Sequence, residues 1–159
     1  MNEQTESKFE YVGFWARVGA TLIDTIIILM ISAPLMYMFY GDSYLYSDDF
    51  VLGFVDVIVN YIFPLVAVLI FWTYKSATPG KMAIKAIIVD ADTGKRPTTK
   101  QYIIRYFGYF GYFISILPLC LGLMWVGWDS KKQGWHDKLA KTVVIRPQNR
   151  RVESVKFNL

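Results

Sequence analysis

FWARVGATLIDTIIILMISAPLMYMFY, residues 14–40, is the stretch that decides the fold. It is long and apolar enough to cross a bilayer as one helix, which takes about 20 mostly apolar residues. Arg17 interrupts it near its start, and Asp24 lies well inside it. A charge at membrane depth is costly, so it usually faces the protein interior or water and often marks a functional position. These two side chains are therefore the first candidates for a functional site.

The two charges share one side of the predicted helix. Arg17 and Asp24 are seven residues apart, which returns to nearly the same face but about 10.5 Å further along the axis. We interpret the stripe Gly13, Arg17, Ala20, Asp24 as the inward face, since small residues let another helix approach closely. For Arg17, a side chain that extends to the lipid headgroups is an equal alternative. Asp24 is too short for that, so we expect its partners to come from other segments.

The composition indicates an integral membrane protein of the all-α class. Of 159 residues, 54% are hydrophobic, and they gather in three blocks near 14–40, 51–74 and 101–128, the pattern of membrane segments. The expected partner is the lipid bilayer, and the net charge of +4 needs no nucleic acid, because the basic residues lie outside the blocks. One cysteine and one histidine exclude an intrachain disulfide and a multi-histidine metal site. We expect no metal and no cofactor.

The second block holds two polar residues, Asp56 and Asn60. They lie four residues apart and so on one helical face. Because Asp56 is close to the start of the block, we expect its carboxylate simply to reach water, as carboxylates at membrane ends can. Both residues remain secondary candidates for the site.

Lysine and arginine set the orientation, because short cytoplasmic loops are rich in both. Residues 41–50 contain neither, whereas residues 75–100 contain six. This difference predicts that residues 75–100 and the N-terminal segment, 1–13, are cytoplasmic, the latter near the membrane surface. It places residues 41–50 outside.

The third block, 101–128, contains Arg105 among aromatic residues and is broken at Pro118 and Gly122. A single crossing would put the basic residues that follow it outside, against the charge rule. Two full crossings need about 40 apolar residues, more than the block has. We therefore expect a re-entrant or short helical hairpin bent near Pro118, with a third span as the alternative. The hairpin predicts a cytoplasmic C-terminus, with a polar tail at 147–159.

Short β-branched stretches at 83–90 (AIKAIIVD) and 142–146 (TVVIR) predict a small cytoplasmic β element, because isolated strands do not persist alone. A turn is expected at Ala77–Lys81 before the first stretch. The pattern Thr98-x-x-Gln101 predicts a capping box that opens the next helix.

His136 and Asp137 form the notable pair between the third block and the last strand. An enzyme is not expected, since the chain shows no nucleophile elbow, metal cluster or phosphate loop. The predicted orientation puts the pair near Arg17 and Arg105 at the cytoplasmic boundary. We expect Asp137 to pair with one of these arginines, and the deeper Asp24 to bind a cation or proton.

Three stretches together give a resemblance to a known family. They are GFWARVGATLIDTIII, TPGKMAIKAIIVDADTGKRPTTKQYIIRY and KKQGWHDKLAKTVVIR, in that order. The chain resembles, over residues 12–146, the RDD family of bacterial membrane proteins, named for one arginine and two aspartates. Arg17 and Asp24 match the first two by position, and Asp137 is our choice for the third, with Asp129 as fallback. Lys141 stands where the family more often has glycine.

The resemblance implies a multi-pass protein of the bacterial inner membrane. It also implies transport of unknown ligands, and some members of the family look like sodium/proton antiporters. Two spans and a hairpin are too few to enclose a pathway, so transport would require a homo-oligomer. The alternative is a structural or accessory membrane protein in which the charged residues fix helix packing.

Overall fold

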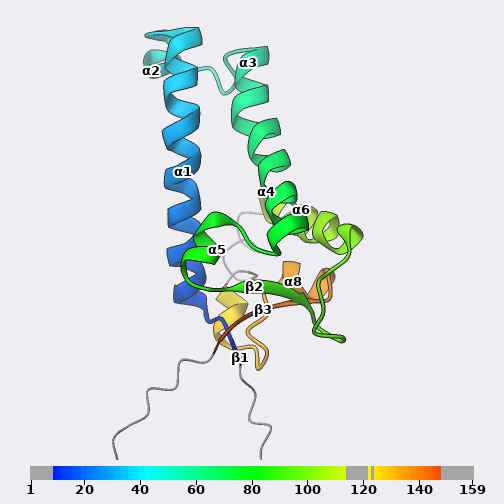
Figure 1. Ribbon diagram of the computed structural model, residues 1–159. Coiled ribbons are helices and arrows are strands. Elements are labelled where there is room, and N and C mark those ends of the chain that lie inside the picture. Colours follow the sequence, from blue (N-terminus) through cyan, green and yellow to red (C-terminus); the bar gives the residue numbers. More distant parts are fainter. Residues whose placement is uncertain (1–8, 114–121, 123, 148–159) are drawn as a thin grey trace, which may run out of the picture.

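A computed structural model describes residues 9–113, 122 and 124–147 (Figure 1). Two long helical segments stand side by side as a hairpin, and a small module lies at one end of it. This basal module is made of β1 (Phe9–Tyr11), α5 (Pro79–Ala83), β2 (Ile87–Asp90), α6 (Thr99–Phe113), η2 (Trp125–Gly127), α8 (Trp135–Leu139) and β3 (Thr142–Pro147). Most of the predicted segment 1–13 and nearly all of the tail 147–159 lie outside the described residues.

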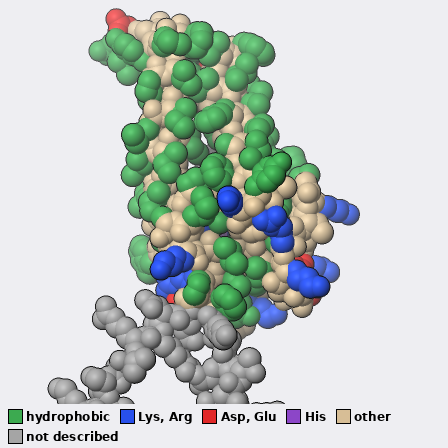
Figure 2. Space-filling model, viewed as in Figure 1, with side chains coloured by type: hydrophobic (Ala, Val, Ile, Leu, Met, Phe, Trp, Pro, Cys, Tyr) green, Lys and Arg blue, Asp and Glu red, His purple; other side chains and the backbone are tan. Residues whose placement is uncertain are grey.

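The first long segment, α1, spans Phe14–Tyr40 as the sequence predicts. It ends at Gly41, whose φ of 53° suits glycine and whose N–H donates to the Tyr37 carbonyl at 2.8 Å. A single turn, α2 (Ser43–Tyr46), follows. Most of the apolar surface of α1 is covered by no protein, as Figure 2 shows along the upper part of the molecule.

The second long segment runs from Phe54 to Lys75 in three parts: α3 (Phe54–Asp56), the π-helix η1 (Val57–Ile62) and α4 (Phe63–Lys75). Pro64 lies in the first turn of α4 and has no N–H to donate to the preceding turn, so the widened turn comes directly before it. Within the described residues, α1 and this segment are the helices that have the length and apolar composition of membrane spans. They indicate a membrane protein.

Asp56 corrects one expectation. Its carboxylate does not simply reach water, because the residue is only 6% exposed. It accepts hydrogen bonds from the Leu52 N–H at 2.9 Å and the Asn60 amide at 2.7 Å. Asp56 and Asn60 therefore fasten the loop at the far end of the hairpin to the start of the second span.

The sheet of the basal module has the strand order β1-β3-β2, with both neighbours antiparallel. The stretches at 83–90 and 142–146 pair with each other, with Ile88 opposite Val144. Strand β2 is shorter than the predicted stretch 83–90. Residues 79–83 form α5 instead of the predicted turn, and Lys85, at φ 57°, redirects the chain before β2 begins. The remaining strand, β1, was not predicted from the sequence.

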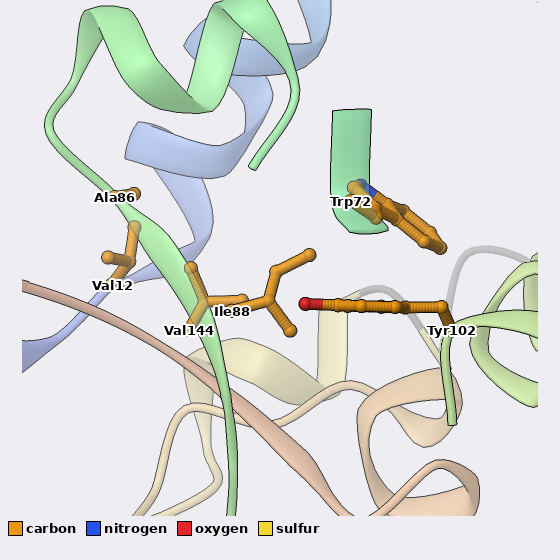
Figure 3. Packing of buried hydrophobic residues seen from close by; sticks show 6 residues of the cluster. All are labelled: Val12, Trp72, Ala86, Ile88, Tyr102 and Val144. Carbon is orange, nitrogen blue, oxygen red and sulfur yellow. The ribbon is translucent and has the colours of Figure 1, made fainter. Parts of the chain in front are cut away.

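The core of the module lies between the sheet, the end of α4 and α6. Figure 3 shows Val12, Ala86, Ile88 and Val144 together around the strands, with Trp72 and Tyr102 beside them. The two aromatic rings lie 5.9 Å apart, centre to centre. The Tyr102 hydroxyl and the Ser76 hydroxyl lie 3.0 Å apart and share a hydrogen bond. This core fixes the end of the second span against the sheet.

The third block begins with α6, which the predicted capping box opens: the Gln101 N–H donates to Thr98 Oγ1 at 3.3 Å and the Thr98 N–H to Gln101 Oε1 at 2.9 Å. Tyr102 and Arg105 of this helix are buried in the basal module. The described helix ends at Phe113. The predicted bend near Pro118, by which the re-entrant hairpin would differ from a third span, lies outside the described residues.

Candidate functional site

A buried ion-pair junction forms around Asp137. Its Oδ2 pairs with Arg17 Nη1 at 2.5 Å and accepts the Gly134 N–H at 3.0 Å, while its Oδ1 pairs with Arg105 Nη1. The side chains of Arg105 and Asp137 are fully buried, and that of Arg17 is 12% exposed. Sequence reasoning expects one of the two arginines as the partner, and the structure brings both to the same carboxylate.

The two arginines extend the junction to neighbouring segments. Arg17 donates from Nε to the Val12 carbonyl at 3.0 Å and from Nη2 to the Lys132 carbonyl at 2.6 Å. Arg105 donates to Thr142 Oγ1 at 2.7 Å. Arg17 therefore does not extend to the headgroups. The junction connects α1, α6, α8 and β3.

His136 lies against this junction without adding a charge to it. It is 2% exposed, and its ring stacks on Tyr109 with 3.9 Å between centroids. Burial lowers the pKa of His136 to about 3, so the imidazole is neutral near pH 7. Burial alone would raise the pKa of the Asp137 carboxyl, but Arg105 and Arg17 hold it well below its usual range. The junction thus contains two cations and one anion.

The lowered pKa of His136 predicts that the stability of the protein depends on pH. Its pKa is lower in the folded chain than in the unfolded chain, so the unfolded chain binds more protons below about pH 6.5. We expect the free energy of unfolding to fall by about 1.4 kcal/mol for each pH unit between pH 6 and pH 4.5. Unfolding of the detergent-solubilised protein at several pH values measures this slope. His136→Gln should lose most of it, and an unchanged slope would contradict the assignment.

Asp24 belongs to a second arrangement, separate from the Asp137 junction. Its Oδ2 accepts the Thr78 hydroxyl at 2.5 Å and its Oδ1 accepts the Gly80 N–H at 2.7 Å. These donors are at the start of α5, which lies directly on α1: a Cβ at Gly80 would be 1.9 Å from the Ala20 carbonyl oxygen. Asp24 therefore anchors α5 to the middle of the first span.

Asp24→Asn is expected to weaken this anchor. An asparagine oxygen accepts one of the two donors, but the amide nitrogen then faces the other. The expected loss is about 1–3 kcal/mol of stability, the usual effect of an unsatisfied buried group. Thermal unfolding in detergent measures it, with Asp42→Asn in the exposed loop between the spans as the matched control. Equal midpoints for the two variants would show that the anchor contributes little.

A cavity of about 410 Å³ lies beside Asp24, between the two spans. Most of its lining is apolar, and Lys81 of α5 also lines it. Lys81 is 9% exposed, and its Nζ lies 5.7 Å from the centre of a Trp72 ring. Burial, followed by the charge of Arg105, lowers the pKa of Lys81 to about 8. Sequence reasoning missed this residue, since it counted Lys81 among the loop lysines that set the orientation.

The fallback residues lie elsewhere. Asp129 pairs with Lys138 at 2.6 Å and accepts the Gln133 N–H at 3.1 Å. Among the residues that the structure describes, it forms no ion pair or hydrogen bond with either arginine of the junction. Asp56 and Asn60 are at the opposite end of the hairpin. The geometry therefore favours Asp137 over Asp129 as the partner of Arg17.

The comparisons with known proteins identify the family of the chain. A family model described as "RDD family" matches residues 11–141. "Uncharacterized protein RP437" from Rickettsia prowazekii (strain Madrid E) is 43% identical over 76 residues, which cover 48% of this chain and 40% of that protein. No solved structure matches the chain. With the family match over most of its length, and with two apolar helices of spanning length, the chain belongs to the RDD family and is a membrane protein.

Proposed function

We propose that this chain is a structural or accessory membrane protein, in which the Asp137 junction locks the basal module to the first span. The observation that supports this best is the position of Asp137 between Arg17 and Arg105. Both carboxylate oxygens are occupied by groups of the same chain. Buried charges can hold one arrangement of helices without doing chemistry. Such a lock keeps the sheet at a fixed position beside the membrane.

The charge distribution supports a cytoplasmic position for the basal module. Lysine and arginine side chains gather on the lower part of Figure 2, and none is seen on the upper part, where a patch of acidic side chains lies at the tip of the hairpin. This distribution agrees with the charge rule for cytoplasmic segments. The proposed location is the bacterial inner membrane, with both ends of the chain in the cytoplasm. Labelling single cysteines near residues 42 and 146 from each side of the membrane tests it.

Sodium/proton exchange is the second candidate, and the cavity beside Asp24 favours it. A carboxylate at this depth, with the Thr21 and Thr25 side chains on the same lining, offers oxygen ligands to a small cation. Two spans cannot enclose a pathway, so this function requires a homo-oligomer. A strictly monomeric protein in native lipid would count against it.

One experiment distinguishes the two candidates. Sodium and proton fluxes are measured in proteoliposomes for the natural chain, for Asp24→Asn and for Arg17→Gln, and folding is measured on the same samples. Loss of folding in the variants, with no flux above empty vesicles in the natural chain, supports the structural function. Flux in the natural chain that Asp24→Asn abolishes without unfolding supports exchange. Equal flux in the natural chain and in Asp24→Asn removes Asp24 from the mechanism.

A further inference from the structure

The ammonium group of Lys81 lacks a partner. Among the residues that the structure describes, no hydrogen bond and no ion pair reaches its Nζ, although more than nine-tenths of the residue is buried. Its contact is the face of Trp72. A buried charge of this kind is unfavourable unless it is paired. Because Lys81 lines the cavity between the spans, a missing partner would lie in that cavity.

The charges around Lys81 do not balance. The charged groups that act on Lys81 are two cations, Arg17 and Arg105, and two carboxylates, Asp24 and Asp137. His136, which lies against the same junction, is neutral near pH 7 because burial lowers its pKa to about 3. Three cations with two carboxylates leave one positive charge. Both carboxylates are already held by other groups, so the site lacks one anion of single charge.

The shape of the cavity indicates what accompanies that anion. Its polar groups gather where α5 meets the spans, and most of the remaining wall is apolar side chains of α1 and α4, among them Ile27, Ile31, Ala67 and Phe71. These helices expose most of their apolar surface, so a wall of this kind faces lipid. Tyr106 of α6 lies in the same lining, and such aromatic residues are typical of the headgroup level.

We propose that this cavity binds an acidic membrane phospholipid, with its phosphate on Lys81 and an acyl chain along the apolar wall between α1 and α4. An acidic phospholipid such as phosphatidylglycerol has one net negative charge, which matches the unbalanced cation, whereas a zwitterionic lipid has none. The phosphate accepts hydrogen bonds from the ammonium group, which is the partner that Lys81 lacks. The bound lipid also raises the pKa of Lys81, which burial and Arg105 lower to about 8. The inference is independent of ion exchange.

Lipid binding by the purified full chain tests the proposal. The probes are dioleoyl phosphatidylglycerol and dioleoyl phosphatidylcholine, added to the protein in detergent and counted by native mass spectrometry. We expect one phosphatidylglycerol bound at least about tenfold more tightly than phosphatidylcholine, the effect of one charge-assisted contact. Lys81→Gln should lose this preference, and Lys81→Arg should keep it. Lys75→Gln, which changes an exposed lysine at the end of α4, is the matched control and should also keep it.

Several outcomes would overturn the proposal. Equal binding of the two lipids, or an unchanged preference in Lys81→Gln, removes Lys81 as the phosphate site. Stabilisation by inorganic phosphate as strong as that by phosphatidylglycerol would show that no acyl chain is bound. If Lys81→Gln does not fold, Ala67→Phe decides, because it fills the apolar wall and should release the lipid. If Ala67→Phe instead dissociates a dimer and leaves lipid binding intact, a second copy of the chain occupies the cavity.

Discussion

Asp137→Asn is expected to unfold the basal module. The substitution removes the one negative charge between the buried Arg105 and the mostly buried Arg17 and leaves their cations uncompensated. Removing one partner of a buried ion pair costs about 3–5 kcal/mol, a large part of the stability of a small domain. We expect the variant to accumulate poorly in membranes and to lose its cooperative thermal transition in detergent. Circular dichroism and the yield of protein in the monodisperse peak measure the effect.

The neighbouring carboxylate provides the control for this prediction. Asp129→Asn removes an aspartate whose partner, Lys138, has a side chain that is 43% exposed, so the expected loss is at most about 1 kcal/mol. A second variant, Arg17→Met together with Asp137→Asn, leaves only one buried cation and should be less damaged than Asp137→Asn alone. If Asp137→Asn and Asp129→Asn unfold at the same temperature, the junction does not hold the module.

Gly80→Ala is expected to displace α5 from the first span. A Cβ at this position would lie 1.9 Å from the Ala20 carbonyl oxygen and 2.9 Å from the Asp24 carboxyl carbon. Backbone cannot yield as a flexible side chain does, so α5 must move and give up the hydrogen bonds to Asp24. Overpacking typically costs about 1–3 kcal/mol and sometimes more. The lost hydrogen bonds add about 1–3 kcal/mol for the groups that they leave unsatisfied.

A second glycine gives the control for this variant. Gly19 lies in α1, next to Ala20, and a Cβ there would meet no atom within 4 Å. Gly19→Ala should therefore leave the melting temperature unchanged or raise it, since alanine favours a helix by about 1 kcal/mol over glycine. Thermal unfolding of both variants in the same detergent provides the comparison. Equal stability of Gly80→Ala and the natural chain would show that α5 is not packed against Ala20.

Much of the architecture could be predicted from local patterns. The spans follow from the length of apolar runs, and the start of α6 follows from the pair Thr98 and Gln101. The pairing of Asp137 with Arg17 or Arg105 could be predicted, because the orientation rule puts all three residues at the same boundary of the membrane, but which arginine it contacts could not. The candidate residues of the site were thus predicted from the unfavourable free energy of a charge in the membrane, without any knowledge of the tertiary fold.

Other features depend on contacts that no local pattern shows. Residues 9–11 have no strand signal strong enough to stand alone, and they form β1 because the edge of β3 is available to pair. The stretch before β2 becomes α5 because Asp24, 56 residues before Gly80, accepts the Gly80 N–H and the Thr78 hydroxyl. Lys81 looks like any loop lysine until the fold buries it. In each case a distant segment of the chain decides the local structure.

The separation between Arg17 and Asp137 has a consequence for biogenesis. The two residues are 120 positions apart, so at a synthesis rate of about 5–20 residues per second the first span waits roughly 6–24 s for its carboxylate. During that interval the guanidinium of Arg17 has no anionic partner from α8. In a nascent chain stalled on the ribosome before residue 137, α1 should therefore be less stably inserted in the membrane than in the released protein. Alkali should extract more of the arrested chains than of the released protein.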